Sequence, residues 1–301
     1  MASPQAEAIN ELYRGWVATM AAKPDMSLDE LRDMFEHWGD LTAEPEGVDY
    51  LEVDAGGVPA MWAVPKHCAQ DRVALCTHGG GYICGSMYSH RKMYGHIAKA
   101  IGCRALILHY RRAPEHPHPA QVEDTLVAYE WLLGQGIEAG HICTTGDSAG
   151  GALSTSVLLA IRERGLPMPA AAMPISPWYD PENRGESIAA NAATDTLVTQ
   201  AILDNMAATF LGGASPRDPL ANLLAADLSG LPPIYVQVGG YEAMLDNSTR
   251  FEPLARAAGV DVKVEVVPEM QHVFHFMAGR APEADDGVQR MAAWVKPKLG
   301  L

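Results

Sequence analysis

The segment GDSAG, residues 146–150, lies between a short apolar run and an amphipathic stretch, and this context limits what it can form. Residues 141–145 are predicted to be a buried strand, and residues 149–164 carry apolar side chains at helical spacing. A G-x-S-x-G segment between a strand and a helix holds its serine exposed on the turn, so Ser148 is a candidate nucleophile. The N–H of Ala149 would lie at the helix N-terminus, where free donors favour a negatively charged oxygen. Taken alone, the segment also fits a glycine-rich connection without chemistry.

A second glycine-rich motif, HGGGY at residues 78–82, follows another apolar run. Glycines allow backbone N–H groups to approach a ligand closely. In a chain that also carries G-x-S-x-G, an HGGG loop after the third strand supplies backbone donors to an oxyanion. We therefore predict Gly80 and Gly81 as oxyanion donors beside Ala149, and His78 as a supporting residue that orients the loop through its ring.

A carboxylate and an imidazole follow two later strand candidates. Residues 234–238 lead into Glu242, and residues 262–267 lead into a short proline-containing loop that ends at His272. Both side chains fall past the C-terminal ends of strands, where open α/β sheets place their ligand chemistry. With Ser148 they give the chain order nucleophile, acid, base. His272 is predicted to take the serine proton, and Glu242 to orient the ring and stabilise its charged form.

Each of these two residues has a competitor nearby. His275 lies just beyond His272, which is favoured because it follows its strand by a short loop. Asp246 lies close to Glu242 and is predicted to cap the helix 247–258, a supporting role that would satisfy free N–H groups. Glu242 is nearer to the strand end, and it is favoured as the acid by the cap role expected of Asp246 and by the family resemblance given below.

Eight strand candidates are spread along the chain, with helical patterns between the later ones. They cover residues 48–53, 61–64, 72–77, 105–110, 141–145, 170–175, 234–238 and 262–267. Two apolar stripes at helical spacing precede the first strand, within residues 9–20 and 28–38, and Ser27 with Glu30 forms a capping box before the second. The strands stop between residues 178 and 231, an insertion with a helical stretch over 199–211. This pattern predicts an α/β fold with a mostly parallel sheet flanked by helices.

The amino-acid composition limits the classes of molecule that this chain is expected to bind. The chain has 301 residues, 48% of them hydrophobic, which suffices to bury the core of one α/β domain. Its formal charge of −15 argues against nucleic acid, because phosphate contacts need clustered Lys and Arg. Neither a signal peptide nor a long apolar run is found, so no membrane span is predicted and a cytoplasmic location is the default expectation. His116 and His118 alternate with prolines and lack a metal-site pattern, so no metal is predicted.

Four features together resemble the hormone-sensitive-lipase-like family of carboxylesterases, the bacterial family IV esterases. They are HGGGY, the segment YRRAPEHPHPA at residues 110–120, GDSAGG, and the distal pair Glu242 and His272. Two departures stand out: Glu242 opens EAMLDN where the family has a DPLRDE-like segment, and Arg112 stands where leucine is usual. A similar Glu-containing segment is typical of a subgroup that includes actinobacterial esterases and monoterpene lactone hydrolases.

The resemblance extends over nearly the whole chain and implies an α/β-hydrolase fold with an eight-stranded sheet and a composite helical cap. Residues 1–45 would form N-terminal cap helices, and residues 46–301 would form the catalytic domain. The insertion 178–231 would be the second cap element. In the resembled family these segments lie over the active site.

The resemblance also implies a reaction. The expected activity is hydrolysis of carboxylic esters or lactones of small to medium, mostly apolar substrates through an acyl-serine intermediate, with no cofactor. The partner would be the small-molecule substrate, and a homo-oligomer is compatible with this reading. Two alternatives stay open: an amidase or peptidase with the same triad, and a non-catalytic small-ligand receptor, like the plant gibberellin receptors that lack a working base. A histidine stands at the base position here, which favours the enzyme.

Overall fold

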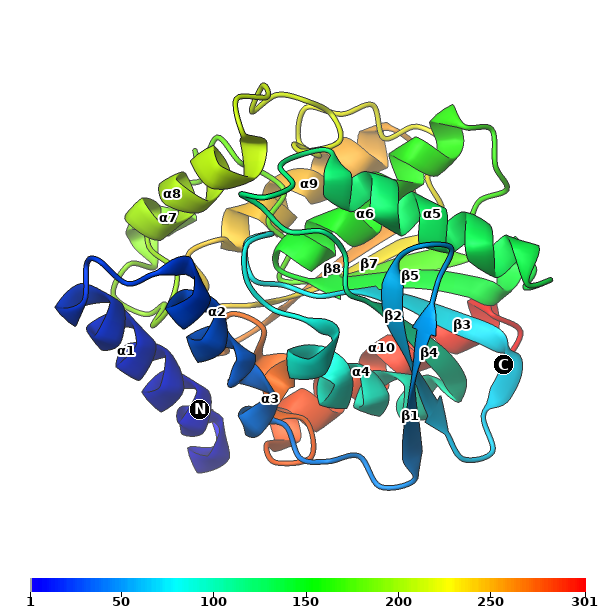
Figure 1. The fold of residues 1–301 in the computed structure, drawn as a ribbon, viewed down its shortest axis with the longest axis horizontal. Coiled ribbons are helices and arrows are strands. Elements are labelled where there is room, and N and C mark those ends of the chain that lie inside the picture. Colours follow the sequence, from blue (N-terminus) through cyan, green and yellow to red (C-terminus); the bar gives the residue numbers. More distant parts are fainter. Residues whose placement is uncertain (1) are drawn as a thin grey trace.

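The predicted strands are confirmed and pair into one eight-stranded sheet (Figure 1). The structure, a computed structural model, describes residues 2–301. Its strands are β1 (Val48–Asp54), β2 (Pro59–Pro65), β3 (Ala69–Thr77), β4 (Cys103–Leu108), β5 (Ile142–Asp147), β6 (Ala171–Ile175), β7 (Ile234–Gly239) and β8 (Val262–Val267). They lie in the order β1-β2-β4-β3-β5-β6-β7-β8. Only β2 runs antiparallel to its neighbours, so the sheet is mostly parallel, as predicted.

Burial along the strands explains why the central ones read as continuous apolar runs. Every residue of β5, β6 and β7 is buried, because helices cover both faces of the sheet there. The edge strand β8 instead mixes buried, intermediate and exposed positions. Because β5, β7 and β8 run parallel, they end at the same edge of the sheet. The three candidate catalytic residues follow those ends.

Helices cover the two faces of the sheet in different sets (Figure 1). The longer helices are α1 (Glu7–Ala22), α2 (Leu28–Glu36), α4 (Met87–Ile101), α5 (Ala120–Gly134), α6 (Ala149–Glu163), α8 (Gln200–Leu211), α9 (Leu245–Ala257) and α10 (Pro282–Val295). The shorter ones are α3 (Trp38–Leu41), α7 (Ser187–Ala190), η1 (Pro4–Ala6), η2 (Ala139–His141), η3 (Phe274–Met277) and η4 (Lys296–Lys298). Helices α5, α6 and α9 pack on one face, and α4 and α10 on the other.

The N-terminal helices and the insertion lie on the same side of the molecule, where α1, α2, α7 and α8 gather at the left of Figure 1. The predicted capping box of Ser27 and Glu30 is confirmed at the start of α2. One detail of the prediction is wrong, because Trp38 does not continue the helix that starts at residue 28. At His37 the backbone N–H bonds to Met34, three residues back, which ends the α-helical ladder and starts the separate helix α3.

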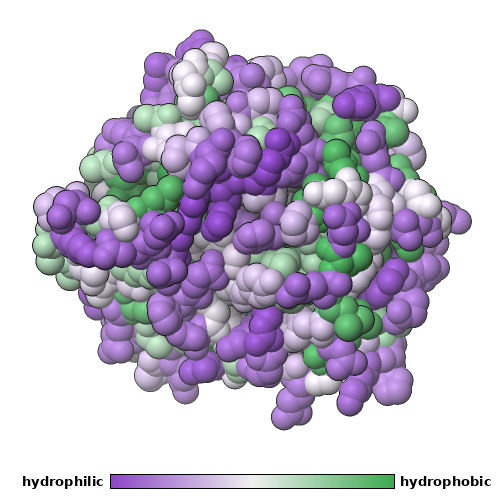
Figure 2. All heavy atoms as spheres, in the orientation of Figure 1, coloured by the Kyte–Doolittle hydropathy of each residue, from purple (hydrophilic) through white to green (hydrophobic). Residues whose placement is uncertain are grey.

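The face drawn in Figure 2 is polar for the most part. Figure 2 shows a face on which hydrophobic residues form small separate groups among hydrophilic ones. Within residues 2–301, no helix combines the length and apolar character that crossing a bilayer requires.

Candidate active site

Ser148 lies on a sharp turn between β5 and α6. Its backbone adopts φ 54° and ψ −120°, a conformation that side-chain-bearing residues seldom take up. The turn is held from the neighbouring strand, because the Ser148 N–H donates to the carbonyl of Ile175 at 2.9 Å. Ala149 is the first residue of α6, so its N–H has no carbonyl within the helix to bond. The local geometry is therefore the strand-turn-helix context in which a G-x-S-x-G serine is exposed.

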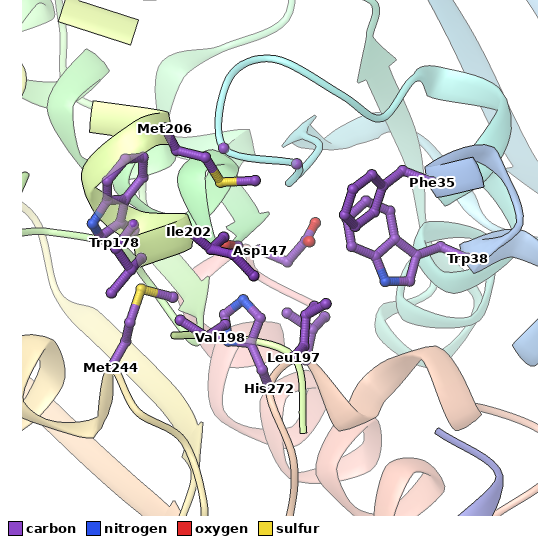
Figure 3. A pocket seen from close by; sticks show the side chains of 15 residues that line it. Phe35, Trp38, Asp147, Trp178, Leu197, Val198, Ile202, Met206, Met244 and His272 are labelled. Atoms are coloured by element: carbon purple, nitrogen blue, oxygen red, sulfur yellow. The ribbon is translucent and has the colours of Figure 1, made fainter. Parts of the chain in front are cut away.

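Ser148 opens into a cavity (Figure 3). The side chains around it come from α2, from α3, from the insertion and from loops at the sheet edge, and most are apolar. The lining residues are Phe35, Trp38, Gly80, Gly81, Asp147, Ser148, Trp178, Leu197, Val198, Ile202, Leu203, Met206, Met244, His272 and Val273. Figure 3 shows Phe35 and Trp38 on one side of the cavity and Trp178, Met206 and Met244 on the other, with His272 between them.

His272 and Glu242 form a buried pair beside Ser148. The Nδ1 atom of His272 lies 2.9 Å from Oε2 of Glu242, which is fully buried. Such a bond leaves Nε2 as the nitrogen that can accept a proton. Within residues 2–301, no hydrogen bond joins the Ser148 hydroxyl to His272, although both side chains line the same cavity. Such contacts often tighten only when substrate binds.

Burial and hydrogen bonding act in opposite directions on the pKa values of this pair. Burial raises the pKa of Glu242, and the hydrogen bonds from His272, Ser176 and the Gly239 N–H partly offset that rise. Burial alone would lower the pKa of His272, but the bond to Glu242 and the nearby negative charges hold it above its usual value. The carboxylate therefore stabilises the charged imidazolium, which is what a partner of a general base has to do.

Ser176, which the sequence analysis missed, connects the two loops that carry the pair. Its hydroxyl donates to Oε1 of Glu242 at 2.6 Å and accepts the N–H of Val273 at 3.2 Å. Ser176 itself has φ 45°. A lone serine after a strand carries no sequence signal of such a role, so only the fold reveals it.

The HGGG loop brings unpaired backbone donors to the cavity. Gly80 and Gly81 have φ values of 108° and 62°, which disfavour side chains. A Cβ atom on Gly80 would lie 2.3 Å from the carbonyl oxygen of Cys84. Within residues 2–301, the N–H groups of Gly80 and Gly81 donate no hydrogen bond, and both residues line the cavity with Ser148. They can therefore donate to an oxygen that develops negative charge there.

His78 supports this loop, although it does not face the cavity. Burial lowers the pKa of His78 well below its usual value, so the ring is neutral, and Nδ1 lies 2.8 Å from the carbonyl oxygen of Gly79. The ring stacks on Tyr110 at 4.2 Å, and the Tyr110 hydroxyl donates to the His78 carbonyl at 2.6 Å. The YRRAPE segment thus supports the glycine loop through its tyrosine.

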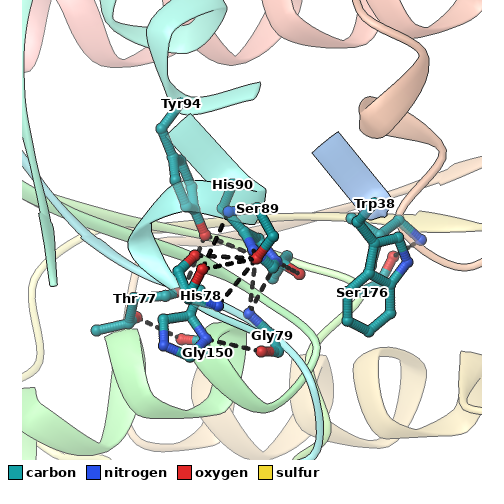
Figure 4. Close-up of polar contacts among 12 residues, drawn as sticks. Trp38, Thr77, His78, Gly79, Ser89, His90, Tyr94, Gly150 and Ser176 are labelled. Carbon is teal, nitrogen blue, oxygen red and sulfur yellow. Dashed lines mark hydrogen bonds and ion pairs between the residues drawn. The ribbon is translucent and has the colours of Figure 1, made fainter. Parts of the chain in front are cut away.

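Asp147, the second residue of GDSAG, is a further residue whose role the sequence analysis missed, and three of its partners, Gly79, His90 and Tyr94, are labelled in Figure 4. Its carboxylate accepts the Gly79 N–H at 3.1 Å and the Tyr94 hydroxyl at 2.6 Å, and it lies 3.3 Å from Nε2 of His90. Burial alone would raise the pKa of Asp147, but His90 and Tyr94 hold it below its usual value. An ionised carboxylate therefore ties the glycine loop to the nucleophile turn.

The two competitors lie elsewhere. His275 is fully buried, and its Nε2 lies 2.7 Å from Oε1 of Gln237 rather than at the cavity. The prediction that Asp246 caps a helix is wrong, because α9 begins at Leu245 and Asp246 lies in its first turn. A tertiary contact accounts for this: Ser187 donates its N–H to the Asp246 carboxylate at 2.8 Å and accepts the Asp246 N–H at 3.0 Å.

Within residues 2–301, no three His, Cys, Asp or Glu side chains are grouped so that they could hold a metal ion.

Comparisons with known proteins agree with the geometry. The sequence profile of a family described as alpha/beta hydrolase fold matches residues 74–276. An acetyl-hydrolase of Streptomyces hygroscopicus is 39% identical over 304 residues, covering 100% of this chain and 99% of that protein. An esterase of Acinetobacter venetianus is 32% identical over 216 residues, covering 71% of each.

Solved structures are similar over the full length. An esterase from the bacterial hormone-sensitive lipase family superimposes with a TM-score of 0.95 at 41% identity and covers 100% of both chains. An esterase/lipase from an uncultured bacterium gives a TM-score of 0.91 at 36% identity, again with 100% of both chains covered. The chain therefore belongs to the alpha/beta hydrolase fold family, and within it to the carboxylic ester hydrolases of the hormone-sensitive lipase type.

Proposed function

We propose that this enzyme hydrolyses carboxylic esters or lactones through an acyl-serine intermediate formed on Ser148. The observation that carries the proposal is the shared cavity. Ser148 on its strained turn, His272 paired with Glu242, and Gly80 and Gly81 with unpaired N–H groups all line it through at least one residue of each group. Nucleophile, base, orienting acid and oxyanion donors are the parts that acyl transfer needs.

In the first half of the reaction, the Ser148 oxygen bonds to the carbonyl carbon while its proton passes to Nε2 of His272. Glu242 stabilises the imidazolium that results. The carbonyl oxygen takes the negative charge and accepts hydrogen bonds from Gly80, Gly81 and Ala149. Collapse of this intermediate breaks the bond to the alcohol oxygen, and the imidazolium gives its proton to the leaving alcohol.

In the second half, water replaces the alcohol. His272 takes a proton from the water, whose oxygen bonds to the acyl carbon, and the bond to Ser148 then breaks as the proton returns to the serine. A lactone would leave its alcohol tethered to the acyl group, so ring closure would compete with water. The same residues serve both substrates.

The cavity wall favours neutral substrates of small to medium size. Apolar side chains such as Leu197, Val198 and Ile202 make up most of the lining. Asp147 adds a buried carboxylate that stays ionised, and it disfavours a second negative charge nearby. The N-terminal segment 1–45 and the insertion 178–231, which supply most of these side chains, are proposed as the two parts of a cap.

Substitution of the nucleophile tests the proposal. Ser148→Ala removes the atom that forms the covalent bond, so turnover of p-nitrophenyl butyrate should fall by roughly 10⁴ to 10⁶. A sulfonyl fluoride should add one sulfonyl group to the wild-type chain, located on the Ser148 peptide by mass spectrometry, and should not modify the variant. Near-normal turnover by a folded Ser148→Ala protein would end the proposal.

A further inference from the structure

Residues 191–198, here called the strap, lie in the insertion and bond to the loop that carries Glu242. The Asn191 amide donates to the carbonyl of Glu242 at 2.8 Å and to that of Gly240 at 3.3 Å. The Thr194 hydroxyl donates to the carbonyl of Tyr241 at 3.2 Å. Three consecutive backbone carbonyls of the acid loop are therefore held from the strap.

The strap also bonds to the residue next to the base. Gln271 accepts the N–H of Thr196 at 3.1 Å through its side-chain oxygen, and its side-chain amide donates to the Thr194 carbonyl at 2.7 Å. The Thr196 hydroxyl further donates to Asn10 of α1 at 3.2 Å. The strap thus connects the acid loop, the base loop and the first helix.

Asp195 is the buried charge at the centre of the strap. One carboxylate oxygen accepts the N–H groups of Leu197 and Val198 at 2.9 and 2.8 Å, and these two residues line the cavity. The other oxygen accepts the N–H of Ala243, the residue after Glu242, at 2.7 Å. One carboxylate therefore joins the cavity wall to the acid loop by charge-assisted hydrogen bonds.

We propose that the strap positions Glu242 and His272 for catalysis and that Asp195 is its principal positioning residue. The inference rests on the proposed roles of those two residues. Catalysis is sensitive to such positioning, since a displacement of about 1 Å can cost on the order of a hundredfold in rate. The acid loop is also held by the N–H of Gly240, which donates to Val267 of β8 at 2.8 Å, and the strap adds the contacts to its carbonyl groups.

Asp195→Asn is the informative variant, because it keeps the shape of the side chain. An amide has one acceptor oxygen, so its NH₂ group must face either the Ala243 N–H or the N–H pair of Leu197 and Val198. One set of bonds is lost and a donor faces a donor. We expect kcat on p-nitrophenyl butyrate to fall by about tenfold to a hundredfold.

The pH profile separates positioning from general damage. Three carboxylates act on the His272 ring, namely Glu242 by direct contact and Asp195 and Asp147 through their charge, and each favours the imidazolium. Removing the charge of Asp195 should therefore lower the pKa of His272. Because the base acts only when neutral, the acidic limb of the kcat/KM profile should move to lower pH.

Two further variants complete the design. Asp180→Asn alters another buried aspartate of the insertion, which pairs with Arg250 at 2.8 Å; among residues 2–301, none of its hydrogen bonds reaches either catalytic loop. Asp180→Asn should reduce thermal stability at least as much as Asp195→Asn does. The acidic limb of its kcat/KM profile should stay at the wild-type pH. Asn191→Ala removes uncharged hydrogen bonds to the acid loop. We expect kcat to fall by a few fold and the acidic limb of the kcat/KM profile to stay at the wild-type pH.

The outcomes are distinct. If Asp195→Asn matches the wild type in both kcat and pH profile while Ser148→Ala is inactive, the strap proposal is wrong and the proposed function stands. An active Ser148→Ala overturns the function instead. If Asp195→Asn does not fold, Asn191→Ala decides: unchanged kcat contradicts the proposal, and a loss of kcat with an unmoved limb supports it. A shifted limb in Asp180→Asn would also contradict it, because that charge lies outside the network.

Discussion

Ser148, Ser176 and Val273 at the candidate site have positive φ angles, as do Tyr82 of the glycine loop and Glu269 of the base loop. Conformations of this kind cost roughly 1 to 3 kcal/mol each and persist only where surrounding contacts enforce them. Here those contacts are hydrogen bonds, since Ser148 is held by Ile175 and Ser176 bonds both Glu242 and Val273. The strained residues Ser148, Ser176 and Val273 thus present the nucleophile, the acid and the backbone beside the base.

The two neighbouring histidines give a prediction at this scale. His272→Ala removes the proposed base and should reduce turnover by several orders of magnitude, on the order of 10³ or more. Burial lowers the pKa of His275 to about 3, so that ring is neutral, and its contact is with Gln237. His275→Ala should therefore lower the melting temperature and leave kcat within a few fold. The check is steady-state kinetics with thermal unfolding of both variants. Loss of turnover in a folded His275→Ala protein would show that the base is misassigned.

At the scale of elements, α1 reaches the base loop from outside the sheet. Tyr13, which is fully buried on α1, donates its hydroxyl to the carbonyl of His272 at 3.0 Å and accepts the indole N–H of Trp38 at 3.3 Å. Burial raises the pKa of Tyr13 well above its usual value, so the phenol remains a donor. Trp38 in turn stacks on Phe276 at 5.6 Å. The N-terminal helices therefore support the base as well as lining the cavity.

Removing one oxygen atom tests this support. Tyr13→Phe keeps the ring in place but deletes the donor to His272, a bond worth about 1 kcal/mol, so kcat should fall roughly fivefold. Tyr129→Phe is a matched control, because that buried hydroxyl also bonds a backbone carbonyl, that of Pro167 at 2.6 Å, away from the cavity. Both variants should lose similar stability, measured by denaturant unfolding, and only the first should lose turnover. Equal kcat values in the two proteins would rule out the proposed support.

At the scale of the whole molecule, we expect size selection to follow from how the cavity is closed. Trp38 of the N-terminal helices and Met206 of the insertion lie on opposite sides of the cavity. A cavity closed from both sides by apolar side chains favours compact ligands. The sheet supplies the chemistry at its carboxyl edge, and the segments outside the sheet set the space above it.

The corresponding test compares the hydrolysis of esters whose acyl groups differ in chain length. Compared as p-nitrophenyl esters below their aggregation limits, butyrate should be hydrolysed with a kcat/KM at least about tenfold higher than palmitate, because the cavity cannot bury a long chain. The Ser148→Ala protein gives the background rate for both esters. A preference for palmitate would mean that these segments do not bound the acyl site.

The sequence by itself predicted the fold, which the structure confirms, and it supplied a candidate triad. Short apolar stretches predicted all eight strands, and the central strands show continuous apolar runs because both of their faces are buried. The residues Ser148, Glu242 and His272 were identified because each follows a strand whose end lies at the same edge of a parallel sheet. Local sequence patterns can therefore locate a candidate site when its residues follow the ends of strands.

Only the tertiary structure decided which other residues hold that site in place. Ser176, Asp195 and Tyr13 are single polar residues in segments far from the triad in sequence, and their spacing carries no pattern. Asp246 is the opposite case. The sequence pattern predicted that it caps a helix, but in the fold its carboxylate bonds to Ser187 instead. Hydrogen bonds between segments depend on where the folded chain brings a donor and an acceptor together, which no periodicity records. The candidate catalytic residues can therefore be recognised in the sequence, whereas the residues proposed to position them appear only in the folded protein.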